Sequence, residues 1–321
     1  MKLTELELIT ELNRVLEKVQ IDINKESPTS CLPKTFIVGC PRSGTTALLQ
    51  YLANTGTWTY PTNFLTRFVH STYVGSLVQE VLFNSKHGLI EQDKAIDFKS
   101  DYGRSSGVLN ANEFFHFFRR FFPTIEIRHL DEENLRQVDI NSLTNEIETL
   151  CQLTQKPFLA KGLMFQYNLS YFHQYLPNSV FVYVKREDEF VMQSIYKARV
   201  QELGNLNQWW SAKPAEYAWL KNKTPEEQIA GQVHFTNQAI EMGLKDIPLA
   251  NKLEIKYEDF VSNPRQVYVN LLSKYHALGN PITESDLPQG SSLVNANKRS
   301  LSKETLDKML GYLELFKGLN V

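Results

Sequence analysis

Short apolar runs of buried-strand type alternate with helical patterns along this chain. The first run, residues 35–38, lies between Pro33 and Gly39 and is followed by a loop and a helical pattern over 45–53. Three similar runs, each followed by a helical pattern, cover residues 157–161, 179–185 and 252–256. Strands that alternate with helices predict an α/β fold with a parallel sheet and helices on both faces.

The rest of the pattern predicts how the chain is divided. Residues 1–33 form an N-terminal amphipathic helix and a polar linker, and residues 34–321 form a single domain with a largely helical, aromatic-rich insertion at about 63–150. The apolar positions of the first helix recur at helical spacing, which predicts that this stripe docks onto the domain. The stripe consists of Leu6, Ile9, Leu12, Leu16 and Val19.

Composition narrows the class of protein. Of 321 residues, 42% are hydrophobic and 22% charged, and the formal net charge is −2, so a nucleic-acid partner held through phosphate contacts is not expected. Cys31, Cys40 and Cys151 form no CxxC pair, which argues against a disulfide scaffold or a zinc site and favours a reducing compartment. No signal-peptide pattern or run of membrane-spanning length is present. We therefore expect a cytoplasmic protein without a metal.

The loop Gly39-Cys-Pro-Arg-Ser-Gly-Thr-Thr46 carries the first chemical signal. A glycine loop between a strand and a helix cradles phosphates with its backbone N–H groups and with the helix N-terminus. Thr45 occupies the position of the lysine in an ATP-binding Walker loop, while Arg42 supplies a cation within the loop. A plain glycine turn is the alternative at this point.

The stretch Phe36–Ala47 resembles the 5′-phosphosulfate loop of sulfotransferases that use PAPS (3′-phosphoadenylyl sulfate). The resemblance implies the PAPS sulfotransferase fold, with Arg42 near the bridging oxygen of the phosphosulfate. It implies a second motif in Arg186, at the end of a strand, and Ser194, eight residues later, for the 3′-phosphate of the donor. The residues implied to bind the donor are Arg42, Ser43, Gly44, Thr45, Thr46, Arg186, Ser194 and, in the tail 295–299, Lys298.

Other stretches have family-like counterparts in the same order, so that the likeness covers about residues 34–275. They are Lys161-Gly162, Pro177-Asn178, Tyr257–Phe260 and Asn263-Pro264.

The position of the general base departs from the family patterns. Leu163 stands where cytosolic sulfotransferases resembling this chain carry histidine, and the 60–63 stretch lacks the glutamate of the tyrosylprotein type. The best remaining candidate is Glu113, which phenylalanines would partly desolvate. His116, expected on the same helical face, is the second. The alternative for Glu113 is a structural acid at a helix start, compensated by Arg119 or Arg120.

Two aromatic stretches have two possible interpretations each. Residues 114–122 include six phenylalanines, which form either core or an acceptor pocket, and Trp209-Trp210 forms either a lid or packing.

The predicted activity is in-line transfer of a sulfuryl group from PAPS to a hydroxyl-bearing small molecule, lipid or glycan, with Glu113, His116 and Arg42 as catalytic candidates and PAP (3′-phosphoadenosine 5′-phosphate) as product. One alternative is a non-catalytic module that binds PAP or PAPS. A P-loop kinase is another, although it would need the lysine that Thr45 replaces and a Mg²⁺-binding carboxylate where the strand ends in Lys185-Arg186.

Overall fold

The computed structural model describes residues 3–26, 32–90, 100–101, 104–284 and 293–319. Its centre is a four-stranded sheet in the order β4-β1-β5-β6, in which each neighbouring pair is parallel. The strands are β1 (Lys34–Val38), β4 (Phe158–Lys161), β5 (Ser179–Lys185) and β6 (Lys252–Lys256). The predicted α/β fold with a parallel sheet is confirmed, and each predicted strand lies within one residue of the observed one.

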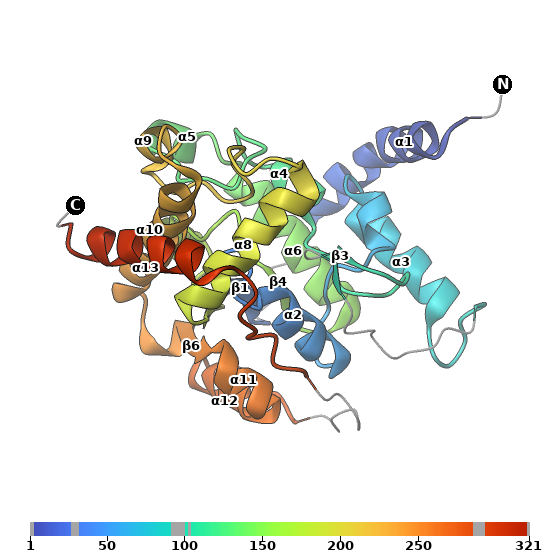
Figure 1. The fold of residues 1–321 in the computed structure, drawn as a ribbon. Helices are drawn as coiled ribbons and strands as arrows, with labels where there is room; N and C mark the ends of the chain where they lie inside the picture. The colour runs from blue at the N-terminus through green and yellow to red at the C-terminus, as the bar shows by residue number, and fades with distance from the viewer. Residues whose placement is uncertain (1–2, 27–31, 91–99, 102–103, 285–292, 320–321) are drawn as a thin grey trace.

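Helices cover both faces of this sheet because the buried strands are apolar on both sides (Figure 1). Residues such as Phe36 and Phe181 pack on one face against helices α6 (Ile140–Thr154), α7 (Leu169–Tyr175) and α10 (Pro225–Lys245). Ile37 and Val182 pack on the other face against α2 (Thr45–Asn54), α11 (Tyr257–Ser262) and α12 (Pro264–Ala277). Helix α2 and the helices that follow β4 in the described residues are α2 (Thr45–Asn54), α7 (Leu169–Tyr175), α8 (Asp188–Leu203), α9 (Tyr217–Leu220), α10 (Pro225–Lys245), η2 (Leu249–Asn251), α11 (Tyr257–Ser262), α12 (Pro264–Ala277) and α13 (Lys303–Lys317).

The segment between α2 and β4 contains several helices and one short antiparallel strand pair. Its elements are η1 (Leu65–Phe68), α3 (Thr72–Phe83), β2 (Ser100–Asp101), β3 (Arg104–Ser105), α4 (Phe115–Arg119), α5 (Glu132–Arg136) and α6 (Ile140–Thr154). Five of the six phenylalanines in the 114–122 stretch are buried in the core that also holds Phe165 and Phe172, and Phe115 is partly buried. The stretch is therefore mainly core.

The N-terminal helix α1 (Glu5–Glu26) forms as expected, but only part of the predicted stripe faces the domain, since Ile9 and Leu16 are partly buried. Leu6 and Val19 of the predicted stripe are 75% and 42% exposed, whereas Asn13 and Gln20 are buried. Asn13 donates to the Arg67 carbonyl (2.7 Å) and accepts from the His70 N–H (2.9 Å). Gln20 accepts from the Tyr73 N–H (2.9 Å). The helix docks through amide side chains because they pair with backbone groups of the segment beneath it.

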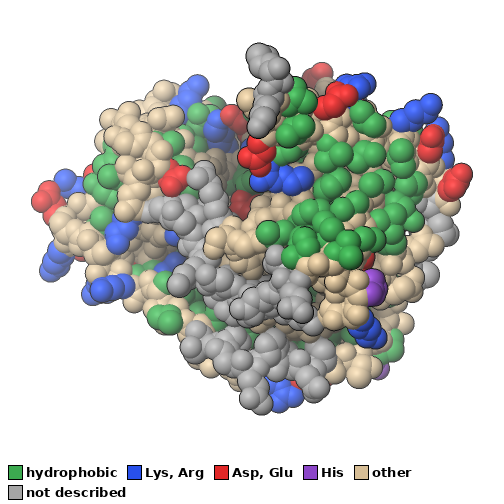
Figure 2. All heavy atoms as spheres, turned by 90° about the vertical axis from the view of Figure 1, so that its right-hand side faces the viewer, with side chains coloured by type: hydrophobic (Ala, Val, Ile, Leu, Met, Phe, Trp, Pro, Cys, Tyr) green, Lys and Arg blue, Asp and Glu red, His purple; other side chains and the backbone are tan. Residues whose placement is uncertain are grey.

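Apolar side chains of α1 and α3 are left at the surface. The two helices lie on the right of Figure 1, and Figure 2, viewed from that side, shows a broad area of apolar side chains. Among the exposed apolar residues of these helices are Leu8, Val15, Leu77 and Val81. No helix in the described ranges is long and apolar enough to cross a membrane.

Candidate functional site

The glycine loop leaves the start of α2 open to an anion. Gly44 occupies the N-cap position in a left-handed conformation (φ +100°), and no side chain of the described residues caps the helix. The first N–H groups of α2 therefore keep their capacity to bind an external acceptor. The Ser43 hydroxyl is buried and has no hydrogen-bond partner in the described part of the chain. An orphaned hydroxyl beside an uncapped helix start fits an oxygen-rich anion such as a phosphate.

Arg42 lies beside the second predicted motif. It adopts a left-handed conformation (φ +73°), which is uncommon for a residue with a side chain. Its Nε donates to the Ser194 hydroxyl (2.8 Å), and its carbonyl accepts from Arg186 (2.9 Å). The structure thus brings Arg42 together with Arg186 and Ser194, which lie more than 140 residues later in the sequence.

Arg186, directly after β5, is the centre of the cationic side of the site. The residue is only 9% exposed, and its guanidinium lies over the Tyr257 ring, 4.6 Å from the ring centroid. It donates to the Asn297 side chain (2.8 Å) and to the Ala296 carbonyl (3.0 Å) of the C-terminal segment. Burial lowers the pKa of Arg186 from its usual value. Lys298, the predicted tail residue, is exposed, and its two preceding neighbours contact Arg186 instead.

Tyr257 contacts the glycine loop, Arg186 and the C-terminal segment. No role in the site was predicted for it from the sequence. Its ring packs so closely on Gly44 that a Cβ at this position would lie only 2.4 Å from the nearest ring atom. Its hydroxyl accepts from the Ala296 N–H (3.1 Å). The ring therefore contacts the loop on one side and supports Arg186 and the C-terminal segment on another. The signal was present, since Tyr257 follows a predicted strand and begins one of the family-like stretches.

Glu113 is paired with Lys161, which lies at the end of β4. The Lys161 ammonium donates to Glu113 Oε1 and also to the Thr46 hydroxyl (3.1 Å). Lys161 is 5% exposed and Glu113 is 22% exposed. The lysine sits at the loop because β4 pairs with β1 in parallel, with Lys161 opposite Ile37. A lysine at the end of a fully buried strand was the sequence signal for this residue.

Two expectations about Glu113 were wrong. Its compensating cation is Lys161, not Arg119 or Arg120, because Arg120 is engaged by the buried Glu146 (2.9 Å). Glu113 and His116 do not share a helical face either. Helix α4 begins only at residue 115, and residue 114 is in a left-handed turn (φ +58°) that separates the two side chains.

A cavity of about 970 Å³ gathers most of these residues. It is lined by the loop, Glu113, His116, Lys161, Leu163, Arg186, Tyr257 and the Trp209–Lys213 segment. That segment is hydrogen-bonded in place: Gln232 donates to the Trp210 carbonyl (2.8 Å), and Lys213 pairs with Glu126. The two tryptophans thus form a wall of the cavity, which we call the reaction cavity. Within the described ranges, no three His, Cys, Asp or Glu side chains form a group that could hold a metal ion.

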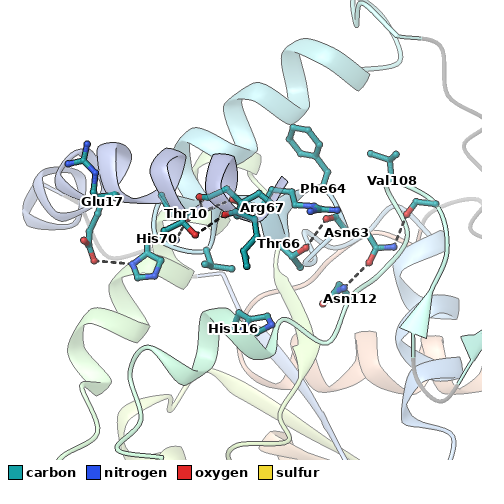
Figure 3. Close-up of a pocket in the computed structure, with 16 residues that line it drawn as sticks. Thr10, Glu17, Asn63, Phe64, Thr66, Arg67, His70, Val108, Asn112 and His116 are labelled. Atoms are coloured by element: carbon teal, nitrogen blue, oxygen red, sulfur yellow. Dashed lines mark hydrogen bonds and ion pairs between the residues drawn. The ribbon is translucent and has the colours of Figure 1, made fainter. Parts of the chain in front are cut away.

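A second cavity, of about 1120 Å³, lies on the other side of segment 112–116 (Figure 3). It is lined by α1, by residues 63–70 and by residues 107–116. Asn112 and His116 line both cavities, so the two meet at this segment.

Comparison with known proteins gives a consistent result. The model of the sulfotransferase family matches residues 33–277. The solved structure of sulfotransferase STF1 from Mycobacterium tuberculosis H37Rv is similar, with a TM-score of 0.51 at 14% identity over 93% of this chain and 75% of that one. Sulfotransferase STF9 from Mycobacterium avium has a TM-score of 0.51 at 11% identity, over 95% and 72%. No curated protein sequence matches. The family match covers most of the chain, and the solved structures share its fold. The chain belongs to the sulfotransferase family.

Proposed function

We propose that this sulfotransferase takes its sulfuryl group from PAPS and transfers it to an acceptor hydroxyl, with Glu113 as the general base. The observation that carries the proposal is the contact of Lys161 with both Glu113 and Thr46 in the reaction cavity. It joins a carboxylate, a cation and the glycine loop at one place. These are the groups that sulfuryl transfer from a nucleotide requires.

The donor site is built from two anion-binding groups. In this proposal the 5′-phosphosulfate binds at the start of α2, where the uncapped N–H groups, the Ser43 hydroxyl and Thr45 and Thr46 are available. The 3′-phosphate binds at the Arg186 guanidinium and Ser194, with Arg42 between the two groups. Lys298 lies at the surface near this second group and is proposed only to add positive charge.

The transfer is written as an in-line displacement. The acceptor oxygen forms a bond to the sulfur, and the bond between the sulfur and the oxygen of the 5′-phosphate breaks, which releases PAP. The proton of the acceptor hydroxyl passes to Glu113. Lys161 neutralises Glu113 in the resting protein; when the sulfuryl oxygens are bound near Thr46, the ammonium can donate to them and leave the carboxylate free to accept the proton. His116, exposed at the edge of the cavity, is the second candidate for the base.

Binding of the donor is tested by thermal shift with PAP and ATP. Saturation at about 100 times Kd adds about 2.7 kcal/mol to the free energy of unfolding. PAP should therefore raise the melting temperature by several degrees and ATP should not. The absence of any shift with PAP would contradict the proposed donor.

Catalysis is tested by transfer of radiolabelled sulfur from PAPS to a panel of alcohols. Glu113→Gln keeps the size of the side chain but removes the base, and kcat should fall by about 100- to 10,000-fold while PAP binding is retained. Glu314→Gln, which removes an exposed glutamate paired with Lys317 on α13, is the control and should retain activity. Full activity of the Glu113 variant would refute the base, and PAP binding without transfer to any acceptor would favour the non-catalytic alternative.

A further inference from the structure

The second cavity adjoins the reaction cavity beside the proposed base. Asn112 and His116 belong to both linings, and Glu113 lies between them in the chain. Figure 3 shows His116 and Asn112 along one edge of the second cavity and Thr10 and Glu17 of α1 on the opposite side. A molecule whose hydroxyl reaches Glu113 could therefore extend past this edge into the space under α1.

Apart from His116, the polar side chains that line the second cavity are already hydrogen-bonded to other groups of the described residues. Asn63 donates to the carbonyls of Ser105 (3.0 Å) and Gly107 (2.7 Å) and accepts from Asn112 (2.7 Å). His70 and Glu17 pair at 3.0 Å, as Figure 3 shows. The remaining pairs are Asn13 with the Arg67 and His70 backbone, Arg67 with Glu5, Arg14 with Glu11, Thr66 with the Asn63 carbonyl and Thr10 with the Leu6 carbonyl. Apart from His116, a polar ligand would therefore have to share or displace partners that these side chains already have.

The rest of the lining is apolar. Its apolar members are Leu6, Ile9, Phe64, Val69 and Val108, which come from α1 and from the two segments beneath it. A glycan placed here would lose hydrogen bonds to water that the cavity does not replace, at a cost of about fivefold to 100-fold in affinity for each one. A hydrocarbon chain would instead gain about fourfold in affinity for each buried methylene group.

We propose that the second cavity holds the apolar tail of the acceptor, and that the acceptor is an amphiphilic alcohol rather than a glycan. The inference rests on the proposed function of the reaction cavity. The tail lies between α1 and residues 63–70, and the hydroxyl passes Asn112 and His116 to reach Glu113. Helix α1 lies outside residues 33–277, which the family model matches. Asn13 holds it in place.

The first test varies the length of the alkyl chain of the acceptor alcohol. Sulfur transfer from PAPS is measured for straight-chain primary alcohols from 1-butanol to 1-dodecanol. We expect kcat/KM to rise by about fourfold for each added methylene until the cavity is filled. A flat series, or one in which sugars are better acceptors than 1-decanol, would overturn the inference.

Two matched variants on α1 test whether the alkyl tail binds in the second cavity. Leu6→Glu places a carboxylate at the cavity, whereas Leu8→Glu, two residues away, changes a side chain outside its lining; both leucines are more than half exposed, so both variants should fold. Leu6→Glu should lower kcat/KM for 1-decanol by about tenfold or more and leave 1-butanol nearly unchanged. Leu8→Glu should change neither. Equal effects of the two variants would refute the location.

A binding measurement separates failure of this inference from failure of the proposed function. Equilibrium dialysis with radiolabelled 1-decanol, without donor, reports the tail site alone, and the PAP thermal shift reports the donor site alone. Decanol that binds the wild type and the Leu8 variant but not the Leu6 variant supports the tail site even if no alcohol is sulfated. A protein that binds PAP and does not bind decanol in this way retains the proposed donor but not the proposed acceptor class.

Discussion

The glycine at the start of α2 gives a sharp test of how the donor site is assembled. Gly44 and Gly56 flank the same helix, and both have a positive φ, +100° and +72°. A Cβ on Gly44 would meet the Tyr257 ring at 2.4 Å, whereas a Cβ on Gly56 would meet no atom within 4 Å. Alanine is strained at both positions, more so at Gly44 because its φ is further from the left-handed region open to alanine, and only Gly44→Ala adds a contact with a ring.

The two costs have different sizes. A left-handed conformation costs a residue with a side chain about 1–2 kcal/mol, which is the loss we expect for Gly56→Ala. Gly44→Ala adds a carbon–carbon contact more than 1 Å shorter than optimal, and such overpacking costs about 1–3 kcal/mol more. The expected total for Gly44→Ala is about 2–5 kcal/mol.

Urea denaturation measures both losses, and calorimetric titration with PAP measures the effect on the site. Because Tyr257 supports Arg186 on its ring, a displaced ring should weaken PAP binding about tenfold or more in Gly44→Ala and leave Gly56→Ala unchanged. If the two variants lost equal stability, or if Gly44→Ala bound PAP normally, Tyr257 would not position the donor site.

Three further outcomes can be measured. Arg186→Lys keeps the charge but loses the planar fork, so titration with PAP should give a Kd about tenfold higher. Arg120→Met leaves Glu146 buried without its partner and should cost about 3–5 kcal/mol. Burial raises the pKa of Glu146 above its usual value and Arg120 lowers it, so the variant raises this pKa further. A group with a raised native pKa loses stability as the pH rises, so the loss measured in urea melts should grow with pH. Glu146→Gln in the same chain should flatten that pH dependence. Asn13→Leu removes two hydrogen bonds to backbone groups and should make α1 the first site of limited proteolysis, with wild-type PAP binding retained.

The sheet could be predicted from the sequence because its signals are local. Strands β1, β4 and β5 are short, mainly apolar runs, β6 alternates apolar and charged residues, and the glycine loop between β1 and α2 is a continuous motif. The strand order β4-β1-β5-β6 was not predicted, but the predicted parallel pairing is enough to bring the strand ends with Lys161 and Arg186 to the same edge as the loop.

The docking of α1 could not be predicted in the same way. The apolar spacing indicated a buried stripe, yet its members Ile9 and Leu16 are only partly buried and the other three are exposed. The fully buried side chains of the helix are Asn13 and Gln20. Their partners are backbone groups of residues 67–73, which are exposed to hydrogen bonding only because that segment is folded in a particular way. Apolar periodicity reports how a helix could pack, but not which polar groups a distant segment leaves unpaired.

The pairing of Glu113 with Lys161 shows where sequence reasoning about the site ends. Arg119 and Arg120 were the nearest cations along the chain, but the left-handed turn at residue 114 directs Glu113 away from α4 and toward the end of β4. The same turn places segment 112–116 between the two cavities. One local reversal thus sets both the partner of the proposed base and the route by which an acceptor would reach it. Residue types alone identified the carboxylate, while its chemistry depends on a lysine 48 positions away.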